Sequence, residues 1–239
     1  MESTHFKLTR NDWESDFFAM EIGRLQFTGG ENAAPHTVQG NESAVFAPFE
    51  LVQCKIHADQ AERIHRLQQL GFQFVEGELD FCLPLSETKS ARNELQTAND
   101  RDLDELENLF GDAFQLSRFR QPWFSAQQNR TFYRTWIGKA VSAQFDDVCL
   151  VQRGADGSIQ GAVSVRSVDT ENARVGLLAV AENARGQGVA KKLVQSAVDW
   201  SAQRQRQQLW IATQSGNQAA IKLYQQSGKI AQVAYWFYR

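Results

Sequence analysis

The chain is poor in cysteine. Its three cysteines, Cys54, Cys82 and Cys149, are odd in number, far apart and without a C-x-x-C pair. This excludes a disulfide framework and is typical of reduced core thiols in a cytosolic protein. His57 lies three residues after Cys54, but with no second such pair the sequence predicts no metal site.

An excess of positive charge is also missing. Lys and Arg total 25 against 28 Asp and Glu, so the net charge is −3, which argues against a general nucleic-acid or anionic-membrane binder. No run approaches the ~18 apolar residues of a membrane span, and M-E-S-T-H-F-K-L-T-R lacks the apolar stretch of a signal peptide. We expect a cytoplasmic protein without membrane insertion, in which any anionic ligand is bound by a local group of residues.

What the chain does have is a composition that can form a sizeable core. Hydrophobic residues make up 42% of the 239 residues, with 16 Phe and six Trp. Residues 29–43 have the composition of a loop and residues 85–94 that of a linker. We therefore predict two domains, 1–90 and 91–239.

Hydrophobic spacing indicates the elements on either side of that linker. Before it, the pattern predicts a helix over 58–70 that stops at Gly71, and a strand over 75–83 with a candidate bulge at Gly77. After it, we expect a helix at 103–110, strands at 147–153, 159–168 and 173–180, a helix at 189–200, a strand at 209–213, a helix from Asn217 to Gly228 and a closing strand at 234–239. Asp156-Gly157 predicts a hairpin between the first two of these strands. The order favours an α+β fold, a mixed sheet with helices packed on it.

One ending occurs twice. L-Q-Q-L-G-F-Q-F-V-E-G at 67–77 and L-Y-Q-Q-S-G-K-I-A-Q-V at 223–233 both read as helix, glycine and strand. We take as a hypothesis that the N-terminal domain is a shortened relative of the second domain. Only the second copy has a glycine-rich loop upstream.

That loop, A-R-G-Q-G-V-A-K-K-L at 184–193, follows an apolar strand and opens a helix. The first N–H groups of a helix lack partners and carry partial positive charge, so glycines there can admit an anion. The alternative is that Gly186 and Gly188 only make a turn. Lys191 and Lys192 add positive charge, or form a solvated helix face.

The loop R-G-Q-G-V-A, the preceding L-A-V and the later N-x-x-A-x-x-x-Y resemble the GCN5-related N-acetyltransferases. The resemblance implies a central, mostly antiparallel mixed sheet flanked by helices, acetyl-CoA as co-substrate and no metal. Many members have Gly where this loop ends in Ala, which the family pattern tolerates. The resemblance implies that the cofactor is bound by Leu178, Ala179, Val180, Arg185, Gly186, Gln187, Gly188, Val189, Ala190 and Asn217, with an N–H near Leu178 polarising the thioester. Without it, Asn217 would read as a simple helix cap.

The same resemblance gives Tyr224 the role of general acid. Because a phenol of pKa about 10 is a weaker acid than a thiol of about 8.5, Tyr224 suits this role as a hydrogen-bond donor or with a lowered pKa; core packing is the alternative. Glu76 matches a family position that can help take the amine proton through water or hold the amine. A solvated strand face, with water as the base, remains the other interpretation.

Four further stretches resemble a group within this family that acetylates the 4-amino group of dTDP-4-amino-4,6-dideoxy-D-galactose in enterobacterial common antigen synthesis. They are N-D-W-E-S-D-F-F at 11–18, the 67–80 segment, S-R-F-R-Q-P-W at 117–123 and A-Y-W-F-Y-R at 234–239. Arg118 and Arg120 are candidates for the nucleotide diphosphate, and an ordinary surface position is the alternative for at least one of them. Acetylation of a protein N-terminus or another small amine, and acyl-CoA binding without catalysis, are the alternatives. The aromatic C-terminal strand could pair across a homodimer axis.

Overall fold

The computed structural model describes residues 6–28, 42–85 and 96–239. Contacts divide the chain into two compact units: unit 1 holds the chain up to Glu78 together with Gln232–Arg239, and unit 2 holds Leu79–Ala231. The boundaries therefore fall inside two long strands. The predicted linker at 85–94 and most of the loop at 29–43 lie outside the described residues, so the division into domains 1–90 and 91–239 stays a prediction.

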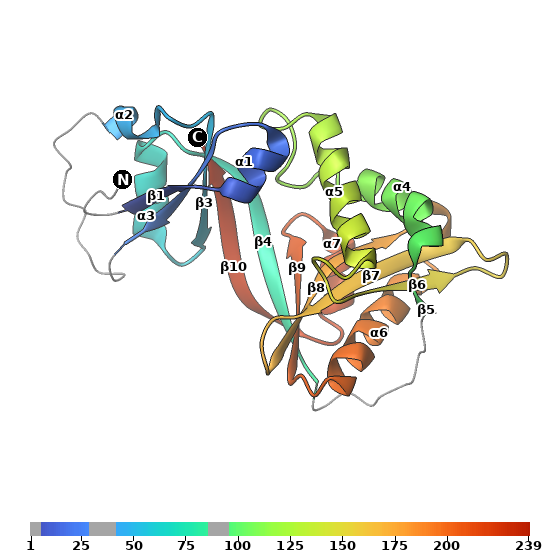
Figure 1. Ribbon diagram of the computed structural model, residues 1–239. Coiled ribbons are helices and arrows are strands. Elements are labelled where there is room, and N and C mark those ends of the chain that lie inside the picture. The colour runs from blue at the N-terminus through green and yellow to red at the C-terminus, as the bar shows by residue number, and fades with distance from the viewer. Residues whose placement is uncertain (1–5, 29–41, 86–95) are drawn as a thin grey trace. The chain divides into compact units, whose positions relative to one another are not determined.

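Unit 1 contains a sheet with the strand order β1-β2-β3-β10-β4 (Figure 1). β1 and β2 are antiparallel, β2 and β3 parallel, and β3 and β10 antiparallel. The elements are β1 (Phe6–Arg10), α1 (Asp12–Phe18), β2 (Ile22–Phe27), α2 (Glu42–Phe46), β3 (Leu51–His57), α3 (Ala61–Gln69), the start of β4 (Gln73–Pro84) and the end of β10 (Lys229–Tyr238).

The core of unit 1 is aromatic. Phe6 stacks on Phe46, and Phe46 meets Phe72 edge to face. Leu67 of α3 is fully buried in the same cluster. The helix expected at 58–70 is thus present in shortened form, with its apolar stripe on the core as predicted.

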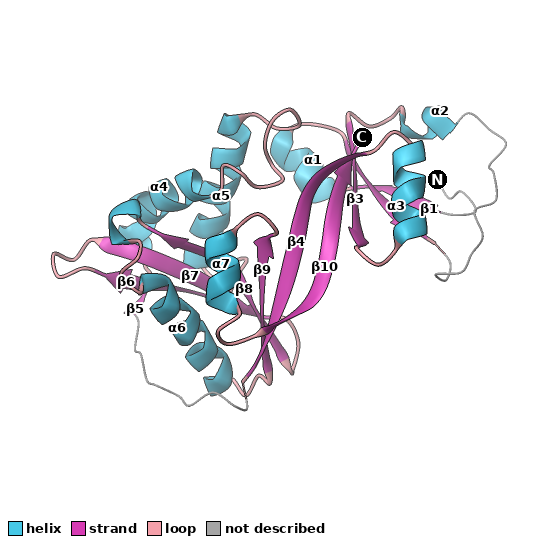
Figure 2. Ribbon diagram, turned by 180° about the vertical axis from the view of Figure 1, so that it is seen from behind, coloured by secondary structure: helices cyan, strands magenta, loops and turns pink. Residues whose placement is uncertain are grey.

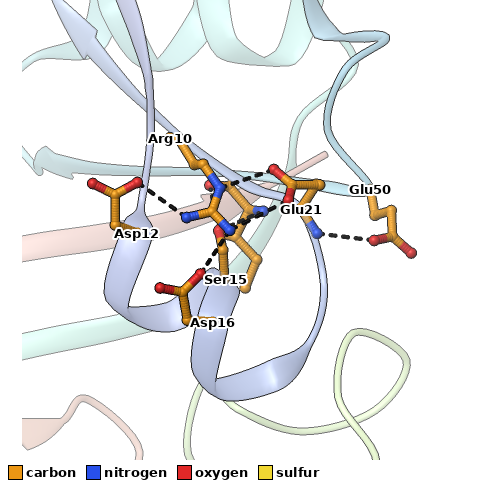
Figure 3. A network of polar contacts seen from close by, with 7 residues as sticks. Arg10, Asp12, Ser15, Asp16, Glu21 and Glu50 are labelled. Atoms are coloured by element: carbon orange, nitrogen blue, oxygen red, sulfur yellow. Dashed lines mark hydrogen bonds and ion pairs between the residues drawn. The ribbon is translucent and has the colours of Figure 1, made fainter.

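An exposed polar network around Arg10 connects the first elements of unit 1 (Figure 3). The guanidinium of Arg10 donates to Asp12, Asp16 and Glu21 at 2.8–3.1 Å. Hydrogen bonds to Glu21, Asp16 and Asp12 raise the pKa of Arg10 above its usual value. The network ties the end of β1 to α1 and to the residue before β2.

Unit 2 contains a sheet with the order β4-β9-β8-β7-β6-β5. α4 and α5 pack together over one face and α6 over the other (Figures 1 and 2). The elements are β5 (Gln96–Thr97), a 3₁₀ turn (Asp100–Asp102), α4 (Leu103–Ala113), α5 (Ala126–Val141), β6 (Val148–Arg153), β7 (Ile159–Ser167), β8 (Asn172–Val180), a second 3₁₀ turn (Glu182–Ala184), α6 (Val189–Gln203), β9 (Gln208–Gln214) and α7 (Gln218–Tyr224). The expected α+β fold is confirmed.

The hairpin expected at Asp156-Gly157 is present. β6 and β7 are antiparallel, and Gly157 has the positive φ of 84° that such a turn requires. Sequence reasoning did not predict α5, although Ser125 and Gln128 form a capping box at its start. No described helix is both long enough and apolar enough to cross a membrane.

Both copies of the repeated ending fold as helix, glycine and strand, namely α3–Gly71–β4 and α7–Gly228–β10. β10 lies between β3 and β4, and β4 lies between β10 and β9. Because β10 has strand neighbours on both sides, the expectation that it could pair across a dimer axis is wrong. A homodimer stays a prediction, without that reason for it.

Candidate active site

β8 and β9 separate partway along their length. Their parallel pairing joins Asn172–Arg174 to Gln208–Trp210, whereas β8 stays paired with β7 as far as Val180. The fork leaves the end of β8 with an open edge. The N–H and C=O groups of Leu178 and Val180 point to this edge and can bind an extended ligand as another strand would, whereas those of Ala179 point to β7.

A bulge in β8 lies directly before these residues. Val163 pairs with Leu178 and Val165 with Val175, so Gly176 and Leu177 together oppose the single residue Ser164. The bulge shifts the alternation of side chains along β8. Before it, Ala173 and Val175 belong to the hydrophobic cluster that contains Leu193 of α6; after it, Leu178 and Val180 pack against that cluster. Leu178 is thus the first residue after the distortion.

The glycine loop connects β8 to the start of α6. Gly186 and Gly188 have φ values of 74° and 78°, and a Cβ at either would meet nothing within 4 Å. Gly188 is the N-cap of α6 and has no side chain that could cap the first N–H groups of the helix. Arg185 and Gln187 are exposed beside them, while Val189 is buried and Ala190 half-buried. The helix start therefore has open space and positive charge around it.

Asn217 caps α7. Its Oδ1 accepts a hydrogen bond from the N–H of Ala220 at 3.2 Å, which is the capping interpretation of this residue. The side chain is exposed, so its amide group can contact a ligand while the oxygen caps the helix. Its role in cofactor binding stays a prediction.

Tyr224 ends α7 with its ring in the core, 5% exposed, and meets Phe81 of β4 edge to face at 5.6 Å. Burial raises the pKa of Tyr224 to about 12, which goes against the alternative of a lowered pKa. In the described part of the chain, no group hydrogen-bonds to its hydroxyl. The packing interpretation thus holds for the ring and leaves the hydroxyl available.

The segment at 114–124 is fixed by buried Asn129, whose Nδ2 donates to Phe114 O, Ser117 Oγ and Phe119 O at 2.8–3.1 Å. Arg120 donates to the carbonyls of Leu116 and Ser117 and so helps to hold this turn.

The two candidate arginines therefore differ. Arg118 lies with its guanidinium 3.9 Å from the Phe119 ring centre and only half-buried. Arg120 is half-buried as well, and a role of either arginine in binding the nucleotide diphosphate stays a prediction.

Glu76 belongs to the part of β4 in unit 1. Its Oε1 accepts a hydrogen bond from the N–H of Gly77 at 3.1 Å, and its side chain is half-buried. Its catalytic role stays a prediction. Within the described residues there is no group of three or more His, Cys, Asp or Glu that could hold a metal.

One buried polar cluster beside the bulge is not predicted by the sequence analysis. Asp146 is fully buried and accepts hydrogen bonds from Trp136, Ser164 and Arg166. Asp146 lies just before β6, and its sequence context is that of a loop residue. Only the long-range packing of α5, β7 and β8 brings these groups together.

Comparison with known proteins gives two sequence matches. The model of the acetyltransferase (GNAT) family matches residues 103–228. A dTDP-fucosamine acetyltransferase from Escherichia coli O6:H1 is 39% identical over 228 residues, which are 95% of each chain.

Solved structures share the fold. A GCN5-related N-acetyltransferase from Sphaerobacter thermophilus gives a TM-score of 0.60 at 16% identity, covering 79% of this chain and 59% of that longer one. A functionally unknown conserved protein from Staphylococcus epidermidis gives 0.63 at 14% identity, covering 100% and 92%.

Proposed function

The chain belongs to the acetyltransferase (GNAT) family and is an N-acetyltransferase, and from this premise we propose that it acetylates the 4-amino group of dTDP-4-amino-4,6-dideoxy-D-galactose with acetyl-CoA. The observation that carries the substrate is the 39% identity to a dTDP-fucosamine acetyltransferase over 95% of both chains. A cytoplasmic location and a homodimer belong to the same proposal and are tested by fractionation and sedimentation.

In this proposal the loop from Arg185 to Ala190 binds the pyrophosphate of acetyl-CoA. The open space around Gly186 and Gly188 supports this, because a phosphate can approach the main-chain N–H groups at the start of α6. Each such interaction contributes roughly 0.3 to 1 kcal/mol when exposed. Arg185, Lys191 and Lys192 add to the local positive charge.

The pantetheine arm then lies along the fork between β8 and β9. Leu178 and Val180 offer main-chain donors and acceptors to its amides, Ala179 lies between them with its own N–H and C=O toward β7, and the exposed amide of Asn217 offers a further contact. The N–H of Leu178 donates to the thioester carbonyl as negative charge develops on that oxygen. Loss of one such donor costs about 10²-fold or more in turnover.

The reaction is a direct attack of the neutral amine on the thioester carbon. The C–N bond forms, the C–S bond breaks, the amine loses a proton and the sulfur leaves as a thiolate. A phenol of pKa about 12 passing its proton to a thiolate whose acid has pKa about 8.5 runs uphill by roughly 5 kcal/mol. Tyr224 therefore acts mainly by donating a hydrogen bond to the leaving sulfur.

Removal of the amine proton is the role of Glu76, directly or through water. Arg118 and Arg120 are the residues proposed for the nucleotide diphosphate, and Arg120 also donates to the carbonyls of Leu116 and Ser117 in the same segment.

Thiol release from acetyl-CoA tests the proposal against three acceptors: dTDP-4-amino-4,6-dideoxygalactose, its gluco epimer and a peptide with a free N-terminus. The proposal expects the galacto sugar to be preferred by kcat/KM. Acetylation of the peptide but neither sugar would overturn the substrate, and acetyl-CoA binding with no turnover of any acceptor would indicate a binding module.

A further inference from the structure

The buried cluster beside the bulge has the form of a support for the fork. Asp146 is 0% exposed. Its Oδ2 accepts from Trp136 Nε1 at 3.1 Å and from Ser164 Oγ at 2.6 Å, and its Oδ1 accepts from Arg166 Nη1 at 2.7 Å. The carboxylate thus joins α5 to β7 by three hydrogen bonds.

Ser164 passes this connection on to β8. While its hydroxyl donates to Asp146, its Oγ accepts from the N–H of Leu177 at 2.9 Å. Leu177 lies within the bulge, where the strand ladder is interrupted and an N–H would otherwise be left unpaired. The side chain of Ser164 therefore replaces the missing ladder contact.

Gly176, the other residue of the bulge, makes room for the carboxylate. A Cβ at this position would lie 2.2 Å from Asp146 Oδ2, closer than atoms can approach. The carboxylate of Asp146 can therefore take this position because residue 176 of the bulge has no side chain.

A cluster of this kind is costly if stability alone is considered. Burying an ion carries a large desolvation penalty, and well-packed apolar residues often serve stability equally well. What the polar cluster adds is direction, because hydrogen bonds fix the path of a main chain more narrowly than apolar contacts do.

We propose that Asp146 and Ser164 are positioning residues for acetyl transfer: they fix the bulge at Gly176-Leu177 and so set the direction of the Leu178 N–H toward the thioester carbonyl. This rests on the proposed function, in which that N–H stabilises the developing oxyanion. Neither side chain touches the substrate in this proposal, and both act through the main chain of β8.

The test is Ser164→Ala. The variant loses both hydrogen bonds of the hydroxyl, and a misplacement of about 1 Å at a reacting centre costs up to ~10²-fold. We expect kcat to fall by about 10-fold or more, while the dissociation constant of CoA changes by less than about twofold because the loop is untouched.

A spectroscopic measurement separates positioning from mere loss of stability. The carbonyl stretch of acetyl-CoA labelled with ¹³C at the carbonyl should be lowered on binding to the natural chain, because the N–H polarises the bond. In Ser164→Ala it should return toward the value of free acetyl-CoA.

Ser201→Ala is the matched control. Ser201 is also 0% exposed and lies in the same unit, but its hydroxyl donates to Ala197 O, within α6 itself. We expect a small loss of stability with kcat and the carbonyl stretch unchanged. If Ser164→Ala behaves in the same way, the inference is overturned.

Trp136→Phe keeps the experiment decisive should Ser164→Ala fail to fold. It removes one of the three donors to Asp146. We expect a smaller fall in kcat and a smaller return of the carbonyl stretch toward the value of free acetyl-CoA. If the folded variant shows neither change, the inference is overturned. Failure of the proposed function looks different, since the natural chain itself would then acetylate no dTDP-sugar. The carbonyl measurement needs no acceptor and still reports on the bulge.

Discussion

The two helix–glycine–strand segments share a local fold but differ in what surrounds them. Gly71 is required for its backbone, with φ of 81° and only Arg239 Nε within 4 Å of a Cβ. Gly228 is required for space, because a Cβ would lie 2.6 Å from Leu83. Four residues before each glycine stands a buried side chain, Leu67 in one and Tyr224 in the other. The same frame thus packs an aliphatic side chain in unit 1 and carries a hydroxyl in unit 2.

The polar networks of the two units differ in how far they are exposed to solvent. The Arg10 cluster is on the surface, with 81% of the Asp12 side chain and 72% of the Asp16 side chain exposed (Figure 3). The Asp146 cluster is buried and adjoins the proposed site. Exposed ion pairs contribute little to stability, whereas breaking a buried pair is costly. Unit 2 therefore combines the fork, the hydroxyl and the buried network, whereas unit 1 contributes Glu76 in the proposal.

Tyr224→Phe should show the largest effect. It keeps the ring against Phe81 and removes only the hydroxyl, so we expect kcat to fall about 10²-fold or more with acetyl-CoA binding retained. Steady-state kinetics and calorimetry measure the two quantities. Tyr235→Phe, on β10 in unit 1, is the control and should leave kcat unchanged. Equal effects of the two variants would remove the contrast between the segments.

Much of the fold of unit 2 could be predicted from the sequence, because glycine loops, hairpins and apolar periodicity are local signals. The loop at 185–190, the hairpin at 156–157 and the helix at 189–200 are all present in the structure. The bulge cluster could not be predicted, since Asp146, Ser164 and Gly176 meet only through long-range packing. α5 was missed despite its Ser125–Gln128 capping box.

Gly188→Ala against Gly71→Ala compares two glycines with nearly equal φ, 78° and 81°. Each substitution costs about 1 to 2 kcal/mol of backbone strain, and neither Cβ meets a close neighbour. Thermal unfolding should therefore respond similarly. Only Gly188→Ala should raise the dissociation constant of acetyl-CoA, by about 10-fold, because its methyl group intrudes on the proposed phosphate site. Similar cofactor affinity in both variants would argue for the turn interpretation of the loop.

The pH dependence should be one-sided. Because burial raises the pKa of Tyr224 to about 12, its phenol stays protonated through the usual assay range. We expect kcat to rise as the acceptor amine deprotonates and then to level off below pH 10. An alkaline decline with an apparent pKa of 8 to 9 that disappears in Tyr224→Phe would contradict this.

Stability should respond to the same shift only at higher pH. Above about pH 10 an unfolded tyrosine ionises, while folded Tyr224 stays neutral up to pH about 12. The free energy of unfolding should thus be independent of this group below pH 10 and fall by roughly 2 to 3 kcal/mol by pH 12. Urea unfolding of the natural chain and of Tyr224→Phe across this range measures the difference.

Arg10→Ala should show the smallest effect. Three carboxylates lose their common cation, but Asp12, Asp16 and Glu21 are at least half exposed, so water replaces the lost interactions. We expect the melting temperature to fall by no more than about 2 °C, less at high salt because screening weakens exposed pairs, and kcat to stay unchanged. A large salt-independent loss of stability would instead mean that the surface network of unit 1 holds its fold as firmly as the buried network holds unit 2.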